Sequence, residues 1–234
     1  MTLRFILTLL CLLQCAYSLK SQDLEAITKG KRVVGGSLGL TIVNDENPGF
    51  DPNDKTTLEE RGFSVYPYAG KFIKDKILVG TSLFASVGDS KFIEDNSFLT
   101  RTRSKEYHNY GIGVFMRKYY PLVGKFGAFI QPDVLFTLRG NEIDRSVFDK
   151  TTGMLSTETP TRVEGFSINT GASLGLYVFI GEKFSLETNL GNLSFNYIRE
   201  EDEGQSQVYR DSNLRLELIN QMSFDKIIVF NYFF

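Results

Sequence analysis

The sequence of 234 residues has no tryptophan, one histidine and only two cysteines. Both cysteines, Cys11 and Cys15, lie near the N-terminus, so the rest of the chain can form neither a disulfide nor a thiolate metal site. After the first 18 residues there is also no run of 18 consecutive apolar residues, which excludes a transmembrane helix. These absences leave few routes to metal or cofactor chemistry, and we expect no cofactor and no metal.

The first 18 residues have the features of a secretory signal peptide. Arg4 supplies the positive charge, residues 5–13 the apolar core, and Ala16–Ser18 a small-x-small cleavage site. The apolar run is too short to span a bilayer as an anchor. Lipid modification of Cys15 is an alternative, although the residue before it is not the small one that such a site needs. We expect residues 1–18 to be removed.

The overall charge argues against a nucleic-acid partner. The chain has 26 Lys and Arg against 28 Asp and Glu, and removal of Arg4 with the signal leaves 25 against 28, a net charge of −3. The mean hydropathy of −0.13 resembles that of a soluble protein. Membrane β-barrels give such averages too, because only half of each strand faces lipid.

Strict alternation over residues 166–180 is the strongest structural signal. Even positions are apolar, from Phe166 to Ile180, apart from Thr170, and the odd positions between them are mostly small or polar. Alternate side chains of a strand point to opposite faces, and a transmembrane strand needs about 9–11 tilted residues with this pattern. At the C-terminus, Ile228, Phe230, Tyr232 and Phe234 also share one face.

Similar alternation predicts an all-β, eight-stranded antiparallel up-and-down transmembrane β-barrel over residues 32–234. The expected strands are 32–43, 61–71, 77–88, 107–117, 126–139, 166–180, 184–199 and 213–234. We expect tight turns at 74–76, near Pro121 and Gly124, and at 181–183. A bulge near Gly191 is needed to keep the phase of the seventh strand, and Pro67 and Pro132 predict bulges or irregular pairing. A soluble barrel such as a lipocalin would reverse the two faces.

The expected connections alternate between long and short. Long segments follow every odd-numbered strand, at 44–60, 89–106, 140–161 and 200–212. Outer-membrane barrels have short periplasmic turns and long extracellular loops, so we expect periplasmic termini, with residues 19–31 as a short periplasmic segment. The first and last long segments are acidic, through Asp45, Glu46, Asp51, Asp54, Glu59 and Glu60, and through Glu200, Glu201, Asp202 and Glu203. A solvated surface is the ordinary interpretation, and a Ca²⁺ site is the alternative.

Several segments resemble the small outer-membrane β-barrel domain family of Bacteroidota. Residues 63–72 followed by 74–80 are similar to a family strand, polar turn and apolar-x-Gly strand. Residues 115–120 are similar to its F-x-R-Y-Y segment, and residues 29–39 to its first strand. The resemblance implies an eight-stranded transmembrane barrel of the OmpA and OmpX type in the outer membrane of a Gram-negative bacterium.

The last strand carries the expected assembly signal of such barrels. Tyr232 and the terminal Phe234 match the family's aromatic ending, whereas Val229 stands where the family usually prefers glycine. We therefore expect recognition by the outer-membrane assembly machinery, surroundings of lipid and lipopolysaccharide, and a monomer.

A barrel of eight strands is just wide enough to hold its own side chains, or one small ligand. Phe84, Phe129, Tyr177 and Phe179 are expected to point inward and fill the lumen. His108 shares parity with lipid-facing residues, so it is not placed for catalysis. We expect a non-enzymatic protein with a structural or surface-interaction role. The alternative is a narrow carrier or binder of small or apolar ligands.

Two charged residues are expected inside the barrel. Arg117 ends the fourth strand and Glu187 begins the seventh, both with inward parity, and these strands face each other across an eight-stranded barrel. Buried charges are normally paired, so we predict an ion pair across the lumen, shared with Asp225 of the last strand.

Overall fold

The computed structural model describes residues 25–48, 54–202, 208–218 and 229–234. The predicted signal peptide and Asp225 therefore lie outside the described residues. A short 3-10 helix precedes the strands, and the elements in chain order are η1 (Glu25–Ile27), β1 (Arg32–Pro48), β2 (Lys55–Lys74), β3 (Ile77–Asp95), β4 (Leu99–Val123), β5 (Phe126–Asp149), β6 (Met154–Thr157), β7 (Thr161–Phe179), β8 (Phe184–Asp202), β9 (Val208–Leu218) and β10 (Val229–Phe233). No helix in the described ranges is long and apolar enough to cross a membrane.

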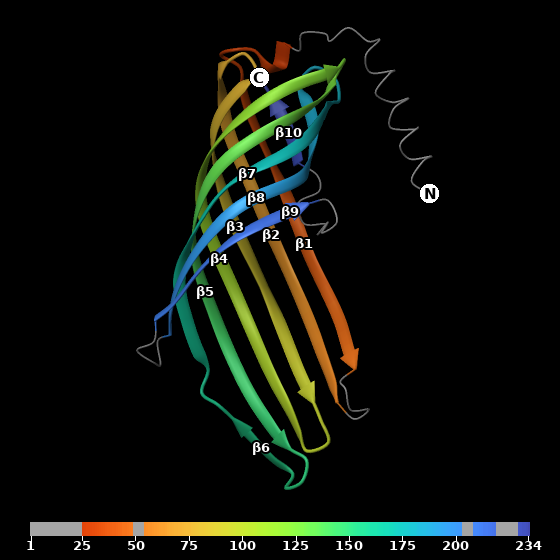
Figure 1. Cartoon of the computed structure of the whole chain (residues 1–234), viewed down its shortest axis with the longest axis vertical. Helices are drawn as coiled ribbons and strands as arrows, with labels where there is room; N and C mark the ends of the chain where they lie inside the picture. Colours follow the sequence, from red (N-terminus) through yellow and green to blue (C-terminus); the bar gives the residue numbers. More distant parts are fainter. Residues whose placement is uncertain (1–24, 49–53, 203–207, 219–228) are drawn as a thin grey trace, which may run out of the picture.

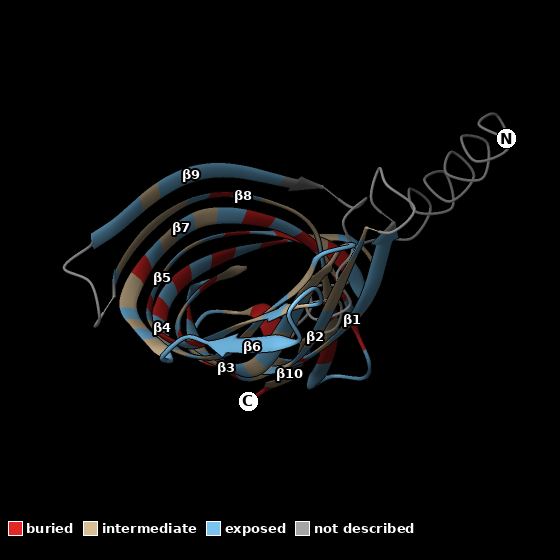
Figure 2. Ribbon diagram, turned by 90° about the horizontal axis from the view of Figure 1, so that it is seen from below, coloured by how far each residue is buried: buried red, intermediate tan, exposed pale blue. Residues whose placement is uncertain are grey.

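The strands form one antiparallel sheet that closes on itself. Its order is β10-β1-β2-β3-β4-β5-β7-β8-β9, and β10 also pairs with β8, which completes the ring. β6 pairs only with β5 and extends that hairpin. Figure 2 views the barrel along its axis, from the end that carries β6. The expected all-β antiparallel up-and-down barrel is confirmed.

The last wall of the barrel differs from the prediction of one strand over 213–234. It consists of two described strands, β9 on the later part of β8 and β10 on its beginning. Ten residues of chain separate β9 from β10, whereas only residues 188–190 separate their partners on β8. Because antiparallel pairing advances one residue for one residue, a single uninterrupted strand cannot satisfy both registers.

The strands are also longer than predicted, and most of the expected loops are strand. β4 has 25 residues and β5 has 24, so they continue well beyond His108 and Arg139 toward β6 (Figure 1). The prediction stopped where the outward face becomes polar and the alternation ends. Pairing continues there because both faces are polar and cross-strand pairs such as Glu59 with Lys91 still support the ladder.

The short connections lie together at the opposite end of the barrel, which we call the turn end. It holds the tight turns after β2, β4 and β7, and the C-terminus (Figure 1). Lys76 (φ 66°) and Gly181 (φ 90°) adopt left-handed backbone in two of these turns. We call the other end of the barrel, which carries β6, the β6 end.

Two kinds of irregularity were predicted in the ladders. The bulge is confirmed, since β7 and β8 shift register where Leu174 pairs with Gly191 and Gly175 with Asn189. The prolines interrupt pairing without a bulge: the β2–β3 ladder lapses at residues 66–67 and the β4–β5 ladder at 131–132, and both resume in unchanged register. The missing N–H of Pro67 and Pro132 explains the lapses.

An uncharged apolar band covers the outside of the barrel. Exposed outward residues include Leu38 (71%), Ile112 (58%) and Leu174 (46%). Each strand contributes to the band; the longest runs are Ile77, Val79, Thr81, Leu83, Ala85 and Val87 on β3, and Phe126, Ala128, Ile130, Pro132, Val134, Phe136 and Leu138 on β5. Such a contiguous exposed apolar surface, with polar and aromatic residues inside, is the arrangement of a protein solvated by lipid.

Candidate functional site

An aromatic cluster fills the interior at the turn end. We call it the plug, and its buried members are Ala26, Ile27, Val33, Tyr68, Phe72, Leu78, Phe115, Tyr119, Phe129, Tyr177, Phe179 and Phe233. The rings pack closely, with centroids 4.9 Å apart for Phe179 and Phe233 and 5.1 Å apart for Tyr119 and Tyr177. The plug leaves these side chains almost inaccessible to water, as a closed interior requires.

The chain preceding β1 covers the plug. Ile27 of η1 is 1% exposed, and its carbonyl accepts a hydrogen bond from the Lys76 amide at 2.8 Å. The Lys29 amide donates to Asp75 Oδ1 at 2.7 Å. The described part of the segment 19–31 is therefore packed into the turn end.

The plug encloses the predicted charged pair. The Arg117 guanidinium contacts the Glu187 carboxylate, and the two side chains are 5% and 0% exposed. Arg117 Nε donates to Gln131 Oε1 at 2.8 Å, and Arg117 Nη1 also donates to the hydroxyls of Tyr68 and Tyr119, both at 3.1 Å. Tyr119 donates to Glu187 Oε1 at 3.0 Å. Several hydrogen bonds thus compensate the cost of burying the two charges.

The structure brings together two of the three residues expected in the lumen. Arg117 and Glu187 meet across the barrel, whereas Asp225 lies outside the described residues. Sequence reasoning missed the other partners, Gln131, Tyr68 and Tyr119. Their inward parity was visible in the sequence, and hydrogen-bonding groups on inward positions near a buried arginine were the available signal.

Inward glycines make room for the rings of the plug. A Cβ atom built on Gly127 would lie 2.5 Å from the ring and hydroxyl of Tyr177, its cross-strand neighbour on β7. The inward ring of Tyr107, nearer the β6 end, lies against Gly88 in the same way. The small and glycine-rich inward face predicted from the sequence thus provides the space against which inward aromatic side chains pack.

The predicted assembly residues lie at the turn end, on the outside of the barrel. The Tyr232 ring is half-buried and packs 5.0 Å from the Phe184 ring, and Phe234 is 49% exposed. Backbone bonds between Arg32 and Phe234, at 2.8 and 2.9 Å, join the C-terminus to β1. These residues close the ring at its turn end.

Farther from the turn end, the described residues of β1 and β9 each pair with one neighbour. β10 pairs with β1 only at residues 33–36 of β1. Within the described residues, the rest of β1 pairs only with β2, and β9 pairs only with β8. Outward residues on these two strands are among the most exposed, with Leu40 at 65% and Leu214 at 74%.

The interior at the β6 end is polar and charged. Inward positions of β4 and β5 carry five cationic residues, which we call the cationic wall: Arg101, Arg103, Lys105, Arg139 and Arg145. Arg139 reaches over Gly165 of β7 to Glu200 of β8, with 3.2 Å between Nε and Oε1. Unlike the plug, this wall retains partial exposure to solvent.

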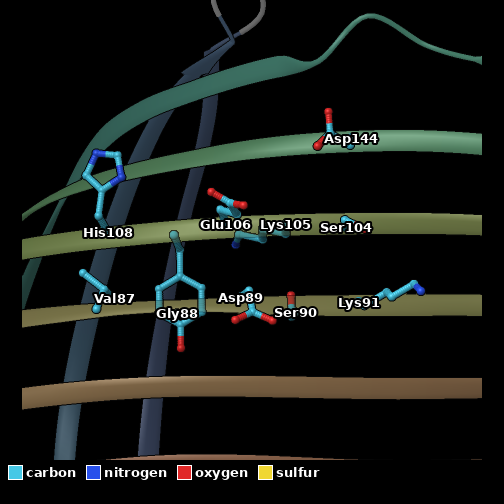
Figure 3. A pocket seen from close by; sticks show the side chains of 11 residues that line it. Val87, Gly88, Asp89, Ser90, Lys91, Ser104, Lys105, Glu106, His108 and Asp144 are labelled. Carbon is cyan, nitrogen blue, oxygen red and sulfur yellow. The ribbon is translucent and has the colours of Figure 1, made fainter.

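His108 lies at the outer edge of the apolar band. Its imidazole packs over Gly140 on the neighbouring strand, and the side chain is exposed. Beside it a cavity of about 580 Å³ extends along β3 and β4, lined in part by Asp89, Lys91 and Glu106 (Figure 3). The described residues contain no group of three or more acidic, histidine or cysteine side chains placed to hold a metal ion.

The comparisons with known proteins give distant structural likeness. No family profile and no curated protein matches the sequence. The chain is similar to the outer membrane protein OprG of Pseudomonas aeruginosa (TM-score 0.39, 13% identity, covering 91% of this chain and 99% of that one). It is also similar to a major outer membrane protein of Thermus thermophilus (TM-score 0.36, 12% identity, covering 87% of this chain and 99% of that one). The resemblance to the Bacteroidota family stays a prediction.

Proposed function

We propose that this protein is a closed, non-enzymatic outer-membrane β-barrel that acts through its β6 end, in a structural or surface-interaction role. The plug carries this proposal. Rings and a paired arginine and glutamate fill the turn end, so a solute would have to break the buried contact of Arg117 with Glu187 to pass. A filled eight-stranded interior is typical of barrels that do not conduct.

The location rests on the outer surface and the chain ends. The uncharged apolar band is suited to contact with lipid. In a closed barrel, the backbone N–H and C=O groups form their hydrogen bonds within the sheet. The signal-like residues 1–18 would direct the chain across the inner membrane. We place the short turns and both ends of the mature chain in the periplasm, which puts β6 outside the cell.

The surroundings of the barrel follow from the same placement. The apolar band would contact outer-membrane lipid and, in the outer leaflet, lipopolysaccharide. The assembly machinery would recognise Tyr232 and Phe234 when the last strand closes the ring. We propose a monomer, because β1 and β10 already pair within one chain.

Ion conductance through the reconstituted protein tests directly whether the barrel is closed. The purified protein, reconstituted into planar bilayers, is expected to give no steady ion conductance, whereas Tyr119→Ala combined with Phe72→Ala should create a leak by removing two buried rings from the plug. Phe63→Ala with Leu83→Ala, on the outer face, serves as a matched control. Steady conductance through the wild-type protein would overturn the proposal of a closed barrel.

Membrane assembly has its own readout. A folded barrel resists detergent unfolding, so unboiled protein is expected to migrate differently from boiled protein on an electrophoresis gel. Identical migration, together with solubility without detergent, would contradict the membrane assignment.

A further inference from the structure

Within the described residues, two charges of the cationic wall have no carboxylate partner. β4 pairs with both neighbours in constant register from Thr100 to Phe115, so Arg103 and Lys105 share the inward parity of buried Phe115. Both therefore project toward the inside of the barrel wall, beyond the apolar band and toward the β6 end.

Three members of the wall have acidic partners. Arg139 lies 3.2 Å from Glu200, Arg145 lies 3.5 Å from Glu158, and Arg101 lies 3.6 Å from Glu94. Among the described residues, Arg103 and Lys105 form no such ion pair. Charged groups do surround Lys105, namely Arg103, Arg139, Glu60 and Glu200, but Glu200 already serves Arg139.

The arrangement opposes like charges. Arg103 stands directly opposite Arg145 in the β4–β5 ladder, and Lys105 is the next inward residue along β4, about 7 Å away. Like charges facing each other across a ladder destabilise a sheet. A local arrangement that costs stability, in a sheet whose other choices support the fold, is characteristic of a functional site.

Neighbouring side chains complete a surface suited to a small anion. Ser90 stands opposite Lys105 and adds a hydroxyl, while Phe92 stands opposite Arg103 and is 42% exposed. Arg103 is exposed, Arg145 is about half exposed, and Lys105 is half-buried, so the charges are reachable and partly desolvated. Planar guanidinium groups bind phosphate oxygens through paired hydrogen bonds.

We propose that Arg103, Lys105 and Arg145 form a binding site, open toward the β6 end, for a soluble solute carrying a phosphate or pyrophosphate group. The site names a ligand class for the surface-interaction role and so rests on the proposed function. The cations face the interior and the plug closes the turn end, so the ligand enters and leaves by the β6 end. The anion neutralises the repulsion between these cations.

Inorganic pyrophosphate, titrated calorimetrically into the purified full chain in detergent, tests the site. The wild-type protein should bind one equivalent saturably, and Arg103→Gln with Lys105→Gln should weaken binding at least about tenfold, because two charge-assisted contacts are lost. Arg61→Gln with Lys91→Gln removes the same charge from the outward face and should change the affinity less than about twofold. Equal losses in the two double variants, or no saturable binding to the wild type, would overturn the proposal.

Thermal unfolding separates a lost ligand from a damaged fold. Without pyrophosphate, the Arg103→Gln and Lys105→Gln variant should unfold at the same or a higher temperature than the wild type, since repulsion is relieved. Pyrophosphate should raise the unfolding temperature of the wild type and leave that of the variant unchanged. A ligand-dependent rise of equal size in both proteins would place binding elsewhere and refute the site.

Two further measurements distinguish a soluble ligand from a lipid headgroup, and a failure of the site from a failure of the proposed function. In lipid nanodiscs, pyrophosphate affinity should be equal with and without phosphatidic acid, and competition by phosphatidic acid would assign the cations to a lipid headgroup and overturn the soluble ligand. Conductance measured on the same preparation reports on the proposed function separately. A closed barrel that binds no pyrophosphate refutes only the site, whereas a conducting barrel refutes the closed function whatever it binds.

Discussion

At the turn end the interior charges are paired, hydrogen-bonded and dry, whereas at the β6 end they are partly hydrated, and two of them lack an acidic partner among the described residues. Arg117 meets Glu187 inside a shell of tyrosine hydroxyls and Gln131. Arg103 instead faces Arg145 across a ladder. The same strand, β4, carries both Arg117 and Arg103 at inward positions, so strand geometry alone does not decide the fate of an inward charge.

The difference lies in what the opposite strands supply. Near the turn end, β8 presents Glu187 across a narrow, ring-filled interior, and solvent is excluded. Near the β6 end, β5 presents Arg145, and the wall stays open to water. Pairing and hydrogen bonding therefore offset the cost of burial at one end, and exposure at the other end leaves charge available for a ligand.

The largest effect should come from separating the buried pair. Arg117→Met and Glu187→Met should each destabilise the barrel by about 3–5 kcal/mol, because each leaves an uncompensated buried charge. The double variant should cost less than the sum, since neither charge remains. Denaturant unfolding of refolded barrels measures the coupling. Additive losses would show that the two charges do not depend on each other and would remove the contrast with the β6 end.

A smaller loss is expected on the lipid face. Leu174→Arg places a charge near the middle of the apolar band and should cost about 2–4 kcal/mol or block assembly. Thr157→Arg, on exposed β6, is the matched control and should be tolerated. Comparable folding yields in bilayers for the two variants would contradict the assigned inside and outside.

A glycine substitution probes the packing of the plug. Gly127→Ala should cost about 1–3 kcal/mol, because the added methyl would lie 2.5 Å from the buried Tyr177 side chain and from the carbonyl oxygen of Tyr120. Gly30→Ala at the covered turn end meets no atom within 4 Å but has a φ of +93°, so its loss measures the cost of backbone strain alone. If Tyr177→Phe, which removes only the hydroxyl, fails to relieve any of the Gly127→Ala loss, overlap with the hydroxyl is not the cause.

The sequence predicts the apolar band and the buried pair because both depend on strict alternation. The apolar residues from Phe166 to Ile180 mark the outward face of their strand, and inward parity together with strand order brings Arg117 and Glu187 to face each other. Alternation fades beyond His108, where both faces are polar, so neither the full length of β4 nor the opposition of Arg103 and Arg145 was predicted. Register between strands, unlike parity within one strand, is not written in a single segment.

The smallest effect concerns a turn at the β6 end, well outside the apolar band. Asp149 Oδ1 accepts hydrogen bonds from the amides of Thr151 and Thr152, at 2.8 and 3.1 Å, and these bonds hold the pKa of the Asp149 carboxyl below its usual range. A lowered pKa in the fold means that the ionised form stabilises the turn above the ordinary pKa of aspartate. That stabilisation is lost as the pH falls through the lowered pKa.

Hydrogen exchange at the Thr152 amide provides the measurement. Protection should decrease as the carboxylate of Asp149 is protonated, whereas Asp149→Asn keeps an acceptor oxygen that does not titrate and should show no such step. The unfolding of the whole barrel should hardly change in either case, because the carboxylate lies near the surface, where solvent screens its interactions. A global pH-dependent loss abolished by Asp149→Asn would mean that the β6 end supports the barrel as strongly as the plug does. The contrast between a stabilising turn end and an available β6 end would then fail.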